Sequence, residues 1–235
     1  MSTLRVLSID MDFFQDVDVD TLVNCYPDGR DLSSPSLAAM IWSSRYSTPD
    51  PNQSLRSVKC PEGKLEELTQ ILLNQDKEIP VLVAQSHLRI YNFIRHLAIE
   101  NDCTNVDIVN IDMHHDMFTD TKGAVDCGNW VNAIRDEFCT SVKWISHPVS
   151  SELFDDKSTE PNLEIVVNDF SSIQDNQFDA IFLCRSDMWF APHLDSKFNE
   201  LARVLVDNFN NIHVGILFDR SQCTASNEIA PLKSL

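Results

Sequence analysis

Residues 106–116 read VDIVNIDMHHD and join a predicted strand to a cluster of acidic and imidazole side chains. The segment Val106–Ile111 is apolar, rich in β-branched residues and followed by polar ones, which is typical of a buried parallel strand running into a loop. In α/β sheets, ligands bind at the loops that follow the carboxyl ends of the strands. The stretch therefore predicts an α/β fold and a site at the end of this strand.

The residues Asp112, His114 and Asp116 lie two apart, so in an extended chain their side chains project from the same side. Two carboxylates and an imidazole that converge on one point are best compensated by a divalent cation. A solvated acidic loop is the alternative interpretation. His115 points to the opposite side, where a packing role is favoured, but a turn would bring it to the site, and it is kept as a candidate catalytic residue.

Strand-like and helix-like segments alternate over most of the chain, which predicts a three-layer α/β/α sandwich with a mainly parallel sheet. The predicted strands are Arg5–Ile9, Pro80–Ala84, Val106–Ile111, Ser141–Ser146, Leu163–Val167, Asp179–Cys184 and His213–Phe218. The predicted helices are Lys64–Leu73, His87–Ile99, Trp130–Phe138 and Lys197–Phe209.

Residues 26–63 interrupt this rhythm. They hold five prolines among many Ser and Asp residues, so they predict a long irregular excursion, which in compact domains is often a lid or a substrate-binding loop. No domain boundary is recognisable, and residues 1–235 are predicted to form a single catalytic domain. The prolines are Pro27, Pro35, Pro49, Pro51 and Pro61.

The chain of 235 residues carries 36 acidic against 18 basic side chains, a net charge of −18. This balance disfavours nucleic acid and anionic membranes as partners, because both would be repelled. It suits a cationic substrate, and a solvated acidic surface accounts for it equally well. With 5 glycines and no Gly-rich phosphate loop, the P-loop and Rossmann classes of nucleotide-binding enzyme are also disfavoured.

The seven cysteines are scattered and form no Cys-x-x-Cys pair, which argues against zinc knuckles and thioredoxin-like sites. No apolar signal segment precedes the first strand, and no apolar run reaches membrane-spanning length. These features predict a cytoplasmic protein with free thiols.

Two more strand ends carry the same class of side chain as the central loop. The first strand ends in Asp10 and Asp12, which share one face, and the second is followed by His87. With the central loop they supply four carboxylates and two imidazoles. That set is sufficient for two metal ions that share a bridging carboxylate and hold a hydroxide at neutral pH.

The arrangement resembles the ureohydrolase, or arginase, superfamily, whose fold deacetylases share. Those enzymes carry a His after one strand, an Asp-x-His-x-Asp motif after the next and an Asp-x-Asp motif elsewhere. The resemblance implies metal ligands at Asp10, Asp12, His87, Asp112, His114 and Asp116. The segment Cys127-Gly128-Asn129-Trp130 is similar to the family's Ser-Gly-Asn substrate loop, which implies that Asn129 and Trp130 bind substrate.

Two departures from the family pattern affect the ligand set and the proton shuttle. The Asp-x-Asp motif of classical arginases follows a late strand, where this chain has Ser186 and Met188. The missing ligands must come from Asp10 and Asp12 through a rearranged topology, in which the first strand docks beside the central one, or in part from Asp187. The shuttle His of arginases falls near Val131, so that role is unassigned.

The early Ile-Asp-x-Asp-Phe-Phe, the central Asp-x-His-His-Asp and the short chain resemble the atypical branch of peptide arginases. The resemblance implies an enzyme with two Mn2+ per chain that converts arginine to ornithine and urea in a ribosomally made precursor peptide. Its partner would be that arginine-containing peptide, admitted by an open cleft. Because a planar guanidinium is best held by a carboxylate, Asp187 at the end of a predicted strand is our candidate for that role.

Two other functions remain open: a deacetylase-like amidohydrolase and a metal-stabilised binding protein without turnover. Deacetylases use one zinc with a catalytic His pair and a Tyr, and the chain has only Tyr26, Tyr46 and Tyr91. The sequence leaves open which peptide is bound, whether free arginine is accepted, which group shuttles protons and what the oligomeric state is.

Overall fold

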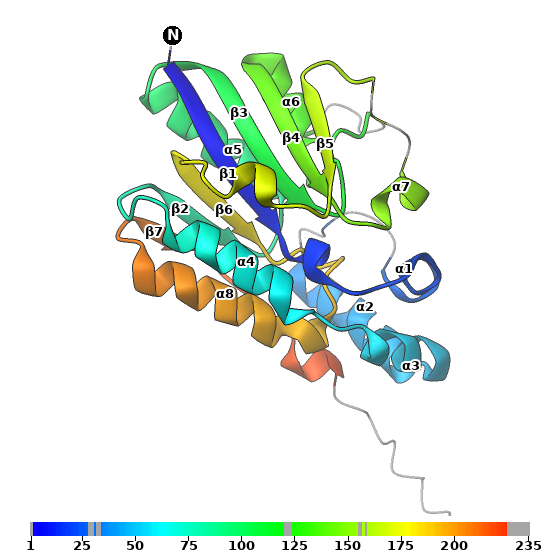
Figure 1. Cartoon of the computed structure of the whole chain (residues 1–235). Coiled ribbons are helices and arrows are strands. Elements are labelled where there is room, and N and C mark those ends of the chain that lie inside the picture. Colours follow the sequence, from blue (N-terminus) through cyan, green and yellow to red (C-terminus); the bar gives the residue numbers. More distant parts are fainter. Residues whose placement is uncertain are drawn as a thin grey trace, which may run out of the picture.

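A single parallel sheet organises the chain (Figure 1). The structure is a computed structural model that describes residues 2–27, 31, 34–119, 124–154, 157 and 159–224. Its sheet has seven strands in the order β5-β4-β3-β1-β6-β2-β7, and every neighbouring pair is parallel. The strands are β1 (Ser2–Asp10), β2 (Val81–Ala84), β3 (Cys103–Asp112), β4 (Cys139–Ser146), β5 (Leu163–Val167), β6 (Ala180–Cys184) and β7 (Ile212–Val214).

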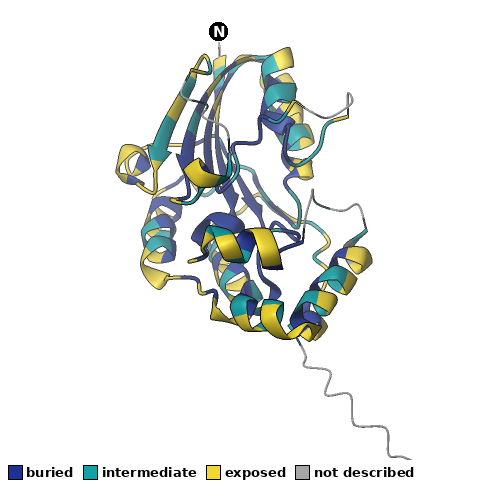
Figure 2. Ribbon diagram, turned by 90° about the vertical axis from the view of Figure 1, so that its right-hand side faces the viewer, coloured by how far each residue is buried: buried dark blue, intermediate teal, exposed yellow. Residues whose placement is uncertain are grey.

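Helices cover both faces of this sheet, and the predicted α/β/α sandwich is confirmed. They are α1 (Val19–Cys25), α2 (Pro35–Ser47), α3 (Pro49–Ser57), α4 (Glu62–Leu73), α5 (Leu88–Glu100), α6 (Trp130–Glu137), α7 (Ser150–Leu153) and α8 (Asp195–Asn208). Alternate strand residues enter two separate cores, as the two-residue period of a strand requires. Figure 2 shows the buried residues concentrated along the sheet and on the inner sides of the helices.

The two cores divide the helices between them. In β1, Leu7 and Ile9 enter the core that contains apolar side chains of α4 and α8, whereas Leu4 and Val6 enter the core formed with α5 and α6. The helices supply these side chains at three- and four-residue spacings, for example Ile90, Ile94 and Ala98 of α5. The two-sided burial explains why the central strands are almost continuously apolar.

Strand β1 lies in the middle of the sheet, between β3 and β6. Its register places Ile9 beside Ile111 and Asp10 beside Cys184. The expected docking of the first strand beside the central one is therefore confirmed. Because the three strands are parallel, their carboxyl ends meet at one edge of the sheet.

The prediction of an irregular excursion over residues 26–63 was wrong. The described part of this region forms α2, α3 and the start of α4. Two of its prolines, Pro35 and Pro49, are the first residues of helices, a position where the missing N–H costs nothing and the fixed φ suits a helix. The prolines therefore begin helices rather than break them. Trp42 of α2 is fully buried and anchors this layer, since its indole Nε1 donates to the backbone oxygen of Asp187 at 2.7 Å.

Strand β7 is shorter than the sequence predicted, because only Ile212–Val214 pairs regularly with β2. Beyond it, Gly215 N still donates to Val83 O, but Phe218 N donates to the side-chain Oε1 of Gln85. None of the helices in the described residues has the length and apolar character that crossing a bilayer requires.

Candidate metal centre

Six acidic and imidazole side chains meet at the carboxyl ends of β1 and β3 and at the start of α5. Asp10 and Asp112 are the last residues of their strands, and His87 directly precedes the first residue of α5. Asp12 lies in the short 3-10 helix Met11–Phe14 that follows β1. With His114 and Asp116 from the loop after β3, the structure brings together all six residues predicted as ligands, and five of them are buried with His114 nearly so.

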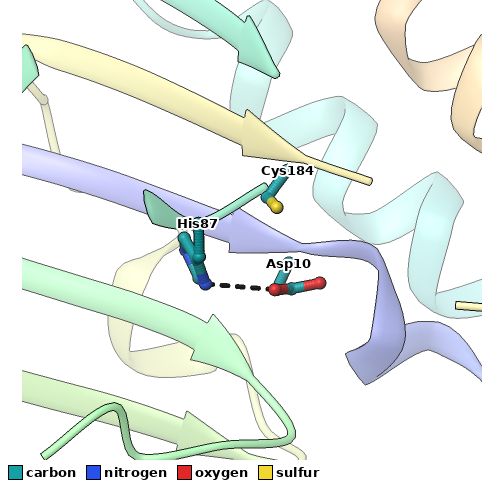
Figure 3. A group of neighbouring side chains, drawn as sticks. All are labelled: Asp10, His87 and Cys184. Carbon is teal, nitrogen blue, oxygen red and sulfur yellow. Dashed lines mark ion pairs between the residues drawn. The ribbon is translucent and has the colours of Figure 1, made fainter. Parts of the chain in front are cut away.

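The first group of ligand atoms surrounds His87. Its Nδ1 lies 3.0 Å from Asp10 Oδ2, 3.2 Å from Asp112 Oδ2 and 3.1 Å from Asp116 Oδ2. Figure 3 shows the contact between His87 and Asp10. One N–H cannot donate well to three acceptors, whereas neighbouring ligands of an octahedral ion with bonds of about 2.1 Å lie about 3.0 Å apart. The spacing fits neighbouring ligands of one metal ion, and the ligand atoms of His87, Asp112 and Asp116 all lie within 4.8 Å of one another.

A second group lies beside the first and shares one residue with it. His114 Nδ1 is 2.9 Å from Asp12 Oδ2 and 3.5 Å from Asp112 Oδ1. Apart from this contact, Asp12 Oδ2 receives no hydrogen bond from the described residues although it is buried. Asp112 turns one oxygen toward each group, which is the arrangement of a carboxylate that bridges two ions.

Hydrogen bonds from the surrounding backbone and side chains orient the ligands. His87 Nε2 lies 2.8 Å from Ser8 Oγ, so with the ring N–H donated to Ser8 the Nδ1 lone pair faces the carboxylates. His114 N donates to Asp112 Oδ1 at 2.7 Å, and Asn110 Nδ2 donates to Asp112 Oδ2 at 3.1 Å. Both oxygens of the shared carboxylate are thereby fixed in position.

Hydrogen bonds also hold the carboxylates of Asp12 and Asp116 in position. Met113 N donates to Asp12 Oδ1 at 3.2 Å, which leaves Oδ2 directed at the second group. The indole Nε1 of Trp130 donates to Asp116 Oδ2. Asp116 itself has a φ of 53°, in the left-handed region that L residues rarely adopt. Such strain persists where the surrounding structure imposes it, and it is often found at functional sites.

The electrostatics of the cluster without a cation are unfavourable. Burial raises the pKa of Asp12 and of Asp116 well above its ordinary value, and the neighbouring carboxylates raise it further. Burial lowers the pKa of His87 and His114, but contacts with the carboxylates outweigh it and leave both raised. Burial also acts to raise the pKa of Asp112, yet bonding to His114 and His87 leaves it below the ordinary value. In the absence of metal, protons therefore take the place of the cation.

Cys184 lies next to Asp10 and His87, as Figure 3 shows, and its thiol is protonated in the metal-free protein. Burial and nearby carboxylates raise its pKa well above the ordinary value, so it stays protonated. Its Sγ accepts a hydrogen bond from Ser186 N at 3.2 Å. The remaining donors are carboxylates and imidazoles, which suit hard to borderline divalent ions.

A cavity of about 210 Å³ opens onto the cluster. It is lined by the acidic and imidazole side chains of Asp10, Asp31, His87, His114 and Asp116 and by Phe118, Phe154, Trp189, Cys127, Gly128 and Ser186. The cavity lining therefore combines acidic and aromatic side chains.

The other residues named from the sequence lie around this cavity rather than in its lining. Asp187 is buried, and its carboxylate accepts hydrogen bonds from Arg185 Nε at 2.6 Å and from an Arg185 terminal nitrogen at 3.2 Å. The carboxylate predicted to hold a substrate guanidinium is thus already bound to an arginine of the chain itself. His115 packs against Phe118 and Trp144 and accepts a hydrogen bond from Met117 N.

Asn129 and Trp130, predicted to bind substrate, do not line the cavity and instead contact residues around it. Asn129 accepts from Asp126 N and donates to Ala124 O, which closes the loop before α6. Trp130 is fully buried and lies 5.4 Å from the His87 ring, between their centroids.

The sequence did not single out Asp31, Phe118 or Phe154 as part of the site. Phe118 follows the metal motif by two residues, and this proximity was a usable signal. Asp31 lies in the region predicted to be irregular and Phe154 follows the short helix α7, so nothing in the local pattern pointed to them. No family model, curated protein or solved structure matches this chain.

Proposed function

We propose that this protein is a hydrolase with two divalent metal ions, of the arginase type, that converts arginine side chains of a peptide to ornithine and releases urea. The observation that carries the proposal is the position of Asp112, whose two oxygens face two separate groups of ligand atoms. A single metal ion would not be bound by both groups of ligand atoms.

The ligands divide between the two ions according to their contacts. His87, Asp10 and Asp116 would hold the first ion, and His114 and Asp12 the second, with Asp112 shared. Manganese is our choice of metal, because the donors are oxygen and imidazole nitrogen and because the motifs resemble those of ureohydrolases. When bound, such a pair supplies Lewis acidity that lowers the pKa of a water molecule to near neutrality.

The lining of the cavity supports an arginine side chain as substrate. An arginine combines an apolar stem with a planar cation. The rings of Phe118, Phe154 and Trp189 can pack on the stem and on the face of the guanidinium. The acidic side chains of the lining attract the cation toward the proposed metal centre. The chain's own residues thereby bind and orient the substrate and exclude bulk water from it.

A deacetylase-like activity is the second candidate, and the tyrosines weigh against it. The Tyr26 hydroxyl bonds to Gln15, that of Tyr46 to His193 and that of Tyr91 to Glu137. The lining of the cavity includes no tyrosine of the described chain, which contains all three.

Metal analysis combined with a peptide assay tests the proposal. The purified protein is loaded with Mn2+, its metal content is measured, and it is incubated with an arginine-containing peptide and with the same peptide carrying lysine. We expect two ions per chain, urea release and a mass decrease of one CH2N2 unit in the arginine peptide alone. One zinc per chain with deacetylation of an acetyl-lysine peptide would replace the proposal by the second candidate. Two bound ions without any turnover would indicate that the protein is a metal-stabilised binding protein and not an enzyme.

A further inference from the structure

Asp31 contributes a carboxylate to the cavity from outside the sequence motifs. It lines the same cavity as Asp10 and Asp116. The surrounding structure holds it at two points: its N–H donates to Cys127 Sγ at 3.2 Å, and its Oδ1 accepts from Met188 N at 3.3 Å. Cys127 also lines the cavity. Asp31 is therefore a fixed part of the cavity wall.

The second oxygen of the Asp31 carboxylate has no partner in the part of the chain that the structure describes. Oδ2 is buried and accepts no hydrogen bond from the described residues. Three other buried polar atoms share this property, and they belong to Asp12, His114 and Asn110, which are ligands or the support of a ligand. The groups that could hold an ion within the described chain do not include Asp31. The negative charge at its free oxygen would therefore be compensated by a cationic group other than a metal ion of the proposed centre.

A buried carboxylate oxygen without a partner carries a desolvation cost that a cationic ligand would offset. Burial raises the pKa of Asp31 to about 6, a bond to Ser86 lowers it, and the charges of Asp10 and Asp187 raise it. Asp187 cannot provide a comparable free acceptor, since Arg185 occupies its carboxylate.

We propose that Asp31 binds the cationic end of the substrate side chain and selects a guanidinium over a neutral group of the same shape. The choice of guanidinium rests on the proposed function, whereas the position of the acceptor comes from the cavity. Oδ1 already accepts from Met188 N, and Ser86 also bonds to this carboxylate, whereas Oδ2 accepts from none of the described residues. A guanidinium can therefore donate a charge-assisted hydrogen bond to Oδ2.

The test compares a peptide that carries arginine with one that carries citrulline, its neutral isostere, on the Mn2+-loaded protein. Binding is followed by tryptophan fluorescence directly after mixing, before turnover accumulates, because Trp189 lines the cavity. We expect the wild-type protein to prefer the arginine peptide. In Asp31→Asn, binding of the arginine peptide should weaken by roughly tenfold to a hundredfold, with citrulline binding and metal content unchanged. Asp31→Glu, which keeps the charge, should retain part of the preference.

Asp50→Asn serves as the matched control, since it removes the same charge from an exposed position on α3. Equal binding of both peptides to the wild-type protein, or an unchanged preference in Asp31→Asn, would overturn the inference. Loss of metal from Asp31→Asn would also overturn it and make Asp31 a ligand. Urea release is measured separately. If the wild-type protein releases no urea but its preference for the arginine peptide is lost in Asp31→Asn, the proposed function is refuted and the inference stands. If the wild-type protein releases urea and Asp31→Asn leaves the KM for the arginine peptide unchanged, the inference is refuted and the proposed function stands.

Discussion

Ser8 Oγ and His87 Nε2 lie 2.8 Å apart in a part of the core that is closed to solvent. In the metal-bound protein, a ring proton on Nε2 would be donated to Ser8 Oγ, and Nδ1 would face the three carboxylates. Removal of the Ser8 hydroxyl allows the His87 ring to turn or to change tautomer. Interactions of this kind behind a metal ligand typically affect metal affinity by tenfold to a hundredfold.

We therefore expect Ser8→Ala to bind Mn2+ roughly tenfold to a hundredfold more weakly than the wild-type protein, while the fold is retained. Titration calorimetry of the metal-free protein measures this change. Thr140→Val is the control, because it also removes a buried hydroxyl that bonds within the chain, to Phe138 O, but from β4. Equal metal affinity in Ser8→Ala and the wild type would contradict the orienting role.

The shared carboxylate predicts different metal contents for two substitutions. Asp112→Ala removes a ligand from both groups, so we expect the protein to retain neither ion. His114→Ala removes a ligand only from the second group and should leave about one ion per chain at the first. Elemental analysis after gel filtration gives both contents, and circular dichroism checks that the fold is intact. Equal metal content in the two variants would argue against two separate groups.

The raised pKa values predict that metal binding strengthens as the pH rises. In the metal-free protein, His87, His114, Asp12 and Asp116 hold protons above their ordinary pKa values of 6.5 and 3.8. A raised folded-state pKa stabilises the metal-free fold at low pH, and this contribution is lost as the pH rises through that value. The cation replaces the protons, so the metal-induced increase in Tm should grow between about pH 5 and about pH 8.

Thermal unfolding with Mn2+ and with a chelator measures this difference at each pH. At a free metal concentration of about a hundred times Kd, the stabilisation should reach about 2.7 kcal/mol. A metal-induced Tm shift that is constant over this pH range, or that falls as the pH rises, would contradict the exchange of protons for metal.

The ion pair between Arg185 and Asp187 predicts that Asp187 acts on stability and not on substrate binding. Both side chains are buried, so Asp187→Asn leaves an arginine charge with fewer partners in the core. We expect the free energy of unfolding to fall by roughly 3 kcal/mol. Urea denaturation measures it, with Asp50→Asn as the surface control. A stable Asp187→Asn with a strongly raised KM would return the residue to the substrate site.

The sequence predicted the sheet and the gathering of the six ligands because both depend on strand periodicity. The β-branched run before Asp112 and the Asp10–Asp12 spacing are local patterns, and parallel strands place such ends at one edge. The absence of late ligands at Ser186 and Met188 gave the additional reason to place β1 beside β3. Tertiary structure was not required for any of these steps.

The cavity could not be predicted in the same way, because its lining depends on contacts between distant segments. Ser186 has a φ of 58°, and this turn lets the side chains of Arg185 and Asp187 meet although they are two residues apart. No strand pattern contains that information. Asp31 is placed by Cys127 and Met188, which lie far from it in sequence. The prolines of residues 26–63 were ambiguous, since proline both ends helices and begins them.

The central position of β1 also determines the order in which the protein can assemble. Its two neighbours are β3 and β6, which come from residues 103–112 and 180–184, so β1 leaves the ribosome well before either of them. Contacts between segments so far apart in sequence are slow to form. Asp10 and Asp12 must therefore remain unpaired during synthesis until residues 87–116 have emerged, and the sheet around them closes only when β6 has been made. In the proposed metal centre, the uptake of metal would therefore be one of the last steps of folding, although Asp10 and Asp12 are synthesised before the other four ligand residues.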